Sequence, residues 1–164
     1  MRAYFVTLAY YNRWANEQIY DAVASLPAEA YFLDRAAFFT SIHGTLNHVL
    51  VGDRVWLHRL TGGQGPRPER LDEILYDNLD DLHAARQAED VRIIEVVSGF
   101  ADAELPAPLS YRNMAGTSQE KPLMIVLGHF FNHQTHHRGQ VHDMLGQAGI
   151  EPPALDLIYF PGLG

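Results

Sequence analysis

Four long stretches of helical hydrophobic periodicity, separated by breaks rich in glycine and proline, constrain the fold of this chain more than any other feature. The periodicity predicts helices over residues 4–25, 41–60, 71–100 and 122–147. Residues 61–68, TGGQGPRP, have the composition of a turn, and Gly149 with two following prolines ends the last helix. Amphipathic helices of about 20–30 residues predict an all-α four-helix bundle. An irregular all-α domain is the alternative.

The segment between the third and fourth predicted helices differs in composition from the rest. Residues 105–122, LPAPLSYRNMAGTSQEKP, contain three prolines and one glycine. A short β-hairpin is possible there, with Leu109–Asn113 as one arm. The whole chain of 164 residues suits one domain over residues 1–164. Its hydrophobic fraction of 47 % is too high for a disordered chain.

Charge and cysteine content exclude several functions. The formal net charge is −8, and the only lysine is Lys121. Nucleic acids and anionic membranes are bound by clustered basic residues, so neither is an expected partner. The absence of cysteine excludes thiolate metal ligands and fits a cytoplasmic protein. No stretch reaches the roughly 20 apolar residues of a membrane span, and the N-terminus is expected to form the first helix rather than a signal peptide.

Histidine is unusually frequent, with nine residues, of which five lie between His129 and His142. A helix advances about 100° per residue, which places His133 and His137 on one stripe, one turn apart. The same stripe contains the apolar residues Val126, Phe130, Val141 and Met144. His129 and His136 fall on its flank, and His142 falls on the opposite face. Two histidines in a core-facing row are difficult to bury unless they share a cation.

A histidine pair at i and i+4 chelates a divalent metal but leaves the site incomplete, so another helix has to supply a ligand. His48 on the second predicted helix is the best candidate, although it lies off the centre of the inward face. Helical spacing places the solvent face of that helix at His43, Asn47, Arg54 and His58. Gly44 and Gly52 flank His48 by one turn on each side. They either leave room for an ion or ligand or allow close helix packing.

Two familiar metal motifs are absent. Residues 133–137 read HQTHH, so Gln134 stands where a zinc protease has its glutamate general base. No Glu-x-x-His sequence occurs, which disfavours a di-iron site. Asp53, on the same predicted helix as His48, could orient a ligand imidazole from a neighbouring helix. A structural salt bridge or hydrogen bond is the preferred interpretation of this residue.

Residues 11–27, 38–62 and 129–149, together with YRNMAGT (111–117) and PPALDLIYF (152–160), resemble the DinB/YfiT-like family of bacterial proteins. The resemblance implies a four-helix bundle of up-down-down-up type, often homodimeric. It also implies a divalent metal held by three histidines, at positions that match His48, His133 and His137. Relatives include S-transferases and isomerases that use low-molecular-weight thiols.

Three protein ligands leave a metal with an open position, as in catalytic sites. The resulting hypothesis is a metal-dependent transferase, in which zinc or nickel activates a small-molecule thiol for attack on an electrophile. One alternative is a metal-binding stress-response module without turnover. Another is a metal-assisted hydrolase, which Gln134 disfavours because it removes the obvious general base.

Overall fold

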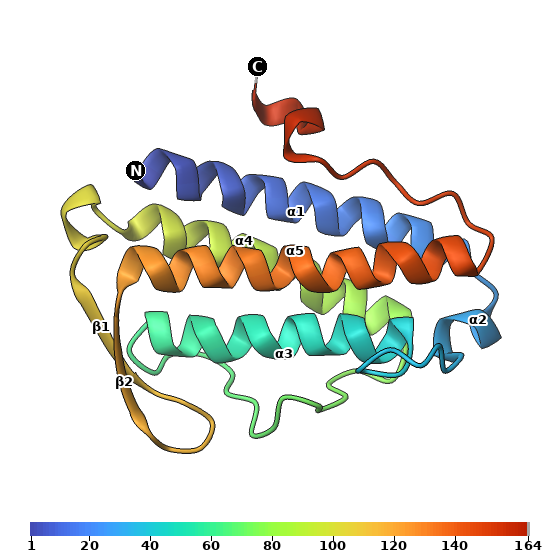
Figure 1. The fold of residues 1–164 in the computed structure, drawn as a ribbon, viewed down its shortest axis with the longest axis horizontal. Helices are drawn as coiled ribbons and strands as arrows, with labels where there is room; N and C mark the ends of the chain where they lie inside the picture. The colour runs from blue at the N-terminus through green and yellow to red at the C-terminus, as the bar shows by residue number, and fades with distance from the viewer. Residues whose placement is uncertain (164) are drawn as a thin grey trace.

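The structure is a computed structural model that describes residues 1–163, and it is mostly helical (Figure 1). The α-helices are α1 (Arg2–Ala24), α2 (Ala28–Phe32), α3 (Ile42–Leu60), α4 (Leu79–Gly99) and α5 (Leu123–Gln147). Two strands, β1 (Pro108–Arg112) and β2 (Ser118–Pro122), lie between α4 and α5. Short 3-10 turns span Asp102–Glu104, Leu157–Tyr159 and Pro161–Leu163. The prediction of a mostly helical fold is therefore confirmed, and the short helix α2 is an addition to it.

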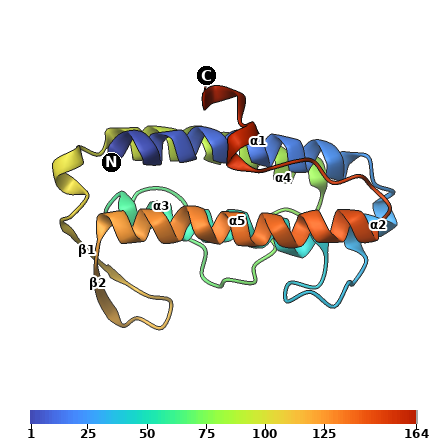
Figure 2. The ribbon, with the colours of Figure 1, turned by 45° about the horizontal axis from the view of Figure 1, so that its top comes forward.

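The four long helices lie side by side in two layers, as Figure 2 shows. One layer contains α1 and α4, and the other contains α3 and α5. Each helix contacts its partner in the layer, and α1 also contacts α5 while α3 contacts α4. The pairing of α3 with α5 brings together the two helices that carry the candidate histidines. No helix among residues 1–163 has the length and apolarity that a membrane crossing requires.

Local sequence signals set the helix ends. The Ser41 side chain accepts a hydrogen bond from the Gly44 N–H at 3.1 Å and caps α3. The Asn78 side chain accepts one from the Asp81 N–H at 2.9 Å and caps α4. Beyond α5, Gly149 has φ +79°, a conformation that suits glycine after a helix end.

The predicted β-hairpin between the third and fourth long helices is confirmed. Strands β1 and β2 pair antiparallel, with Tyr111 opposite Gln119. Gly116 in the connecting turn has φ +79°, which glycine adopts without steric cost. Leu109 and Tyr111 pack against the apolar core, so one face of the hairpin is fixed to the helices.

The prediction of a helix over residues 71–100 is wrong in its first turns, because α4 begins only at Leu79. Residues 61–78, here called the α3–α4 segment, cross the outside of α3 without forming a helix. The Asn47 side chain explains the difference. Its Oδ1 accepts hydrogen bonds from the N–H groups of Leu75 and Tyr76 at 2.8 and 3.1 Å, which replaces helical bonding there. This tertiary contact outweighs the helical pattern of residues 71–78.

The same segment corrects the predicted solvent face of α3. Asn47 is completely buried, and His43, Arg54 and His58 are half-buried. The His43 ring and the Asn47 side chain both bond to the Tyr76 carbonyl. Because α4 and the α3–α4 segment cover this side, α3 is enclosed almost all round.

The apolar core has two parts. One gathers around Leu57, Phe130 and Phe131, and the other around Leu50, Val141 and Leu145. Between them, the middle of the helices carries buried polar side chains: Asn12, Asn16, His48, Asp53, Arg86, Asp90, Gln134, His137 and Arg138. The candidate histidines belong to this polar middle layer.

Candidate metal centre

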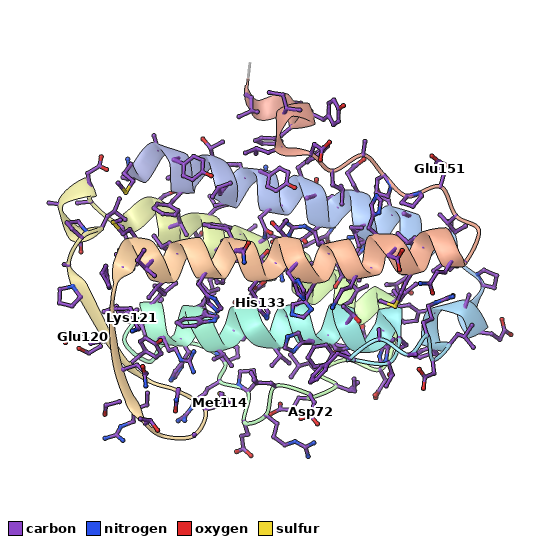
Figure 3. The ribbon with its side chains drawn as sticks, in the orientation of Figure 1. Asp72, Met114, Glu120, Lys121, His133 and Glu151 are labelled. Atoms are coloured by element: carbon purple, nitrogen blue, oxygen red, sulfur yellow. The ribbon has the colours of Figure 1, made fainter. Side chains whose placement is uncertain are left out.

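Three histidines from two neighbouring helices converge in the middle of the molecule. His48 comes from α3, and His133 and His137 come from α5. Each offers one ring nitrogen, and the three nitrogens all lie within 4.8 Å of one another. His48 Nε2 is 3.2 Å from His133 Nε2. Figure 3 shows His133 between α3 and α5.

Hydrogen bonds fix two of the three rings. His48 Nδ1 lies 2.7 Å from the Leu71 carbonyl oxygen, which can only accept, so Nδ1 carries the proton. His137 Nδ1 lies 2.8 Å from Gln140 Oε1 and donates in the same way. Both rings are therefore left with a lone pair on Nε2. The Phe39 ring stacks on His48 with centroids 3.7 Å apart and holds its plane.

Burial keeps the three imidazoles neutral. Desolvation, together with the neighbouring His137 and His48, lowers the pKa of His133 to about 3. Desolvation also lowers the pKa of His137 to about 4, against the hydrogen bond to Gln140, which raises it. The pKa of His48 is lowered by burial as well. Neutral imidazole is the form that binds a metal, so the three histidines can bind a metal at pH 7 without first losing a proton.

The donor set fits a divalent transition metal. Two nitrogens bound to one tetrahedral zinc ion at about 2.0–2.1 Å lie about 3.3 Å apart. The 3.2 Å separation between His48 Nε2 and His133 Nε2 is close to that value. Imidazole ligands suit zinc, nickel and copper, and three protein ligands leave a position open for another molecule.

Two glycines of α3 make this approach possible, each in a different way. A Cβ atom on Gly52 would lie 2.7 Å from His133 Cε1, so Gly52 provides the space that the His133 ring occupies. A Cβ atom on Gly44 would lie 2.1 Å from the Phe39 carbonyl oxygen. Gly52 thus leaves room for the ring of a candidate ligand, whereas Gly44 allows the backbone at Phe39 to pack closely against α3.

The cluster opens into a cavity of about 430 Å³. His48 and His133 line one part of the cavity, and Trp56, Leu71 and Met114 line other parts. In Figure 3, Met114 of the hairpin turn and Asp72 of the α3–α4 segment lie on the same side of α3. A small molecule that enters this cavity therefore meets the His48 and His133 side chains.

The remaining histidines lie outside the cluster. His129 and His136 are exposed on its flank, where helical spacing placed them. His142 lies on the other side of α5, with Nε2 3.1 Å from the Pro153 carbonyl oxygen. His83 stacks on Tyr20, at 4.7 Å between centroids. His58 lines a second cavity near the end of α3.

Asp53 contacts none of the three histidines. Its carboxylate forms a buried ion pair with Arg86, whose guanidinium also pairs with Asp90 at 3.0 Å. The structure confirms the salt-bridge interpretation of Asp53. Sequence reasoning missed two groups that orient the rings: the Leu71 carbonyl and Gln140. The i, i+3 spacing of His137 and Gln140 is a signal that could have identified the second, whereas no local signal marks Leu71.

Arg138, which follows His137 directly, is buried and not a surface residue. Its guanidinium donates to the side-chain oxygens of Asn12 and Asn16, the latter at 3.1 Å. It also donates to Gln134 Oε1 at 3.3 Å. These bonds connect α5 to α1, on the side of α5 turned away from α3.

Comparison with known proteins places these features in a family. The model of the DinB family matches residues 1–162. The chain is 31 % identical over 150 residues to Protein DinB of Bacillus subtilis (strain 168), covering 89 % of this chain and 87 % of that protein. It also resembles the crystal structure of a DinB-like protein from Bacillus cereus ATCC 10987, with a TM-score of 0.62. That similarity covers 85 % of this chain and 89 % of the other at 20 % identity, and it supports the fold alone.

Proposed function

This chain belongs to the DinB family, and from that premise we propose that it binds a divalent metal and activates a low-molecular-weight thiol for transfer to an electrophile. The ligands are His48, His133 and His137. One observation carries the proposal: three imidazole nitrogens converge within 4.8 Å beside an open cavity. The four long helices are interpreted as the four-helix bundle of this family.

A divalent cation held by these nitrogens would keep an open position and lower the pKa of a thiol bound there. The protein's own groups prepare the site. Leu71 and Gln140 fix the protons of two rings on Nδ1, which leaves both Nε2 lone pairs free for a metal. Trp56 and Met114 offer apolar surface to the substrates.

The proposed reaction is a substitution. The thiol loses its proton to water, and its sulfur forms a bond to an electrophilic carbon of the second substrate. The bond from that carbon to the leaving group breaks, and the leaving group departs with the bonding electron pair. The products are a thioether and the released group.

Hydrolysis is less well supported than thiol transfer. It needs a general base near the reacting water, and among residues 1–163 no Asp or Glu lines the cavity, which leaves His129 as the lining side chain outside the proposed ligands that could accept a proton. Gln134, one residue after His133, is buried on the other side of α5 and hydrogen-bonded to Arg138. The other alternative is a metal-binding stress-response module without turnover, and a turnover assay distinguishes it from a transferase.

Metal binding is tested first. We expect protein purified without a histidine tag to contain about one equivalent of zinc or nickel by elemental analysis. His48→Ala, His133→Ala and His137→Ala should each lose the metal. His142→Ala is the matched control, because His142 lies on α5 but outside the cluster. Equal metal content in all four variants would refute the site.

Turnover is tested second. The metal-loaded protein is incubated with a panel of small thiols and a chromogenic aryl halide, and thioether formation is followed by absorbance. We expect at least one thiol to react faster than with the His137→Ala variant. Metal binding without such turnover would favour the non-catalytic alternative. The homodimer that the family resemblance implies and the cytoplasmic location that the absence of cysteine fits are also part of the proposal, and light scattering tests the dimer.

A further inference from the structure

We propose that Arg59 recognises a carboxylate, so that the ligand of the histidine centre is an elongated anionic molecule with its thiol at one end and its carboxylate at the other. This inference rests on the proposed function and names the class of thiol that the site accepts. It is carried by the surroundings of Arg59 and by its position on α3.

Arg59 is a half-buried cation without a counter-ion. Its guanidinium lies 4.4 Å from the centre of the Trp56 ring and 5.0 Å from that of Tyr111. In the part of the chain that the structure describes, it has no hydrogen bond and no carboxylate within 4.0 Å. By contrast, Arg54 and Arg86 on the other side of α3 are both paired with carboxylates. Stacking on two rings holds the guanidinium in place and leaves its N–H donors available to a ligand.

Two cavities meet at Arg59. The cavity of about 430 Å³ contains His48 and His133, and a second cavity of about 260 Å³ adjoins it. Arg59 and Met114 line both of them. Arg67 and Arg112 line the second cavity as well.

The charge of these cavities is opposite to that of the molecule. The chain has a formal net charge of −8. Among residues 1–163, however, three arginines and no Asp or Glu line the two cavities. Burial lowers the pKa of Arg59, and the nearby Arg67 lowers it further by repulsion, whereas Tyr111 raises it. An anion between the two guanidinium groups would relieve that repulsion and be held by both.

The sequence separation between His48 and Arg59 aligns the two ends of the site. Eleven residues correspond to about 1100°, or three turns plus about 20°, so both side chains leave α3 in nearly the same direction. The axial rise between them is about 16 Å. Side chains on a helix lean toward its N-terminus, so the Arg59 side chain leans toward His48. Trp56 and Leu71 line the space between.

This order of groups defines the ligand. The reacting sulfur lies at the histidines, an apolar middle packs against Trp56, and a carboxylate accepts hydrogen bonds from Arg59. A planar guanidinium pairs with the two oxygens of a carboxylate in a fork geometry. Because the Arg59 side chain reaches toward His48, the ligand has to span less than the three helical turns between the two backbones, and a three-carbon thiol acid is too short to use both ends of the site.

The test compares two thiols that differ only at the far end, 8-mercaptooctanoate and 8-mercaptooctan-1-ol. Their binding to the zinc-loaded protein is measured by isothermal titration calorimetry. We expect the acid to bind about tenfold or more tightly than the alcohol, because hydrogen bonds to a charged group contribute more than neutral ones. The short acid 3-mercaptopropionate should show no such advantage over 3-mercaptopropan-1-ol.

Arg59→Met retains an apolar side chain over Trp56 and removes the charge. We expect it to abolish the preference for the acid and to leave zinc affinity and thermal stability unchanged. Arg59→Lys should restore part of the preference. Arg13→Met, on α1 and outside both cavities, controls for the loss of one positive charge and should behave like the unchanged protein.

The outcomes separate this inference from the proposed function. If zinc binds but the acid and the alcohol bind equally, or if Arg59→Met retains the preference, the role of Arg59 is overturned and the metal site stands. If zinc does not bind, the proposed function fails. The role of Arg59 can then be tested without sulfur or metal, by comparing the binding affinities of octanoate and 1-octanol. A preference for octanoate that Arg59→Met abolishes would then support the carboxylate site alone.

Discussion

His48 Nδ1 lies 2.7 Å from the carbonyl oxygen of Leu71, and this bond ties a candidate metal ligand to a segment that is not helical. The α3–α4 segment is in turn held by Asn47, the residue directly before His48. The orientation of the His48 ring is therefore set by tertiary structure around α3 as well as by α3 itself.

Replacing Asn47 should weaken metal binding without removing a ligand. Asn47→Ala loses the two hydrogen bonds from the Leu75 and Tyr76 N–H groups, so the Leu71 carbonyl is no longer held over His48. Loss of groups that orient metal ligands costs about 10- to 100-fold in affinity. Competition with a chromogenic chelator measures the change.

Asn78→Ala is the matched control for Asn47→Ala. It removes the cap of α4, at the end of the same segment, and should cost about 1 kcal/mol of stability. Its metal affinity should remain that of the unchanged protein. Equal metal affinities in the two variants would show that Asn47 does not act through His48.

Gly52→Ala should lower metal affinity although alanine favours helices. The added methyl group would meet the His133 ring at 2.7 Å and displace it from the cluster. Gly128→Ala on α5 is the control, because its Cβ would meet nothing within 4 Å. That control should gain up to about 1 kcal/mol of stability and bind metal normally. A Gly52→Ala variant with unchanged affinity would refute the role of Gly52.

Arg86→Met should strongly destabilise the fold. It leaves the buried carboxylates of Asp53 and Asp90 without their cation. Removing one partner of a buried ion pair costs about 3–5 kcal/mol, measured here as the free energy of unfolding in urea. At low temperature the folded fraction should still bind metal, because neither carboxylate contacts the histidines. A loss of less than about 1 kcal/mol, the scale of an exposed ion pair, would contradict the prediction.

His133 and His137 should each lower the stability of the metal-free protein as the pH falls below about 6.5, the pKa of histidine in an unfolded chain. In the folded protein the pKa values are about 3 for His133 and about 4 for His137. Between these limits the two histidines bind more protons in the unfolded state, so their contribution to the free energy of unfolding decreases with decreasing pH. Burial raises the pKa of Asp53 to about 7, so Asp53 acts in the opposite sense, and the contribution of the histidines is measured as the difference from a variant that lacks them.

The pH effect is measured as the melting temperature of EDTA-treated protein between pH 8 and pH 5. A His133→Asn, His137→Asn double variant should lose less stability over this range than the unchanged protein. His142→Asn should retain the full dependence. Parallel curves for all three proteins would show that the two histidines are not buried in neutral form.

The last helix and its histidine pair could be predicted because their signals are local. The spacing of His133 and His137 fixes their common direction as soon as residues 123–147 are helical, and Val126, Phe130, Val141 and Met144 on the same stripe are buried. The hairpin was marked by prolines and glycine, and its first strand is Pro108–Arg112. The third ligand position was weaker from spacing alone, and the family resemblance contributed most to it.

The start of α4, the enclosure of α3 and the partner of Asp53 were decided only by tertiary structure. The Asn47 side chain takes the N–H groups that a helix at Leu75 and Tyr76 would have used. Arg86 reaches Asp53 from a different helix, 33 residues away. A helical period specifies directions within one helix, whereas these contacts depend on which helices and segments pack together. The same packing brings His48 Nε2 to 3.2 Å from His133 Nε2.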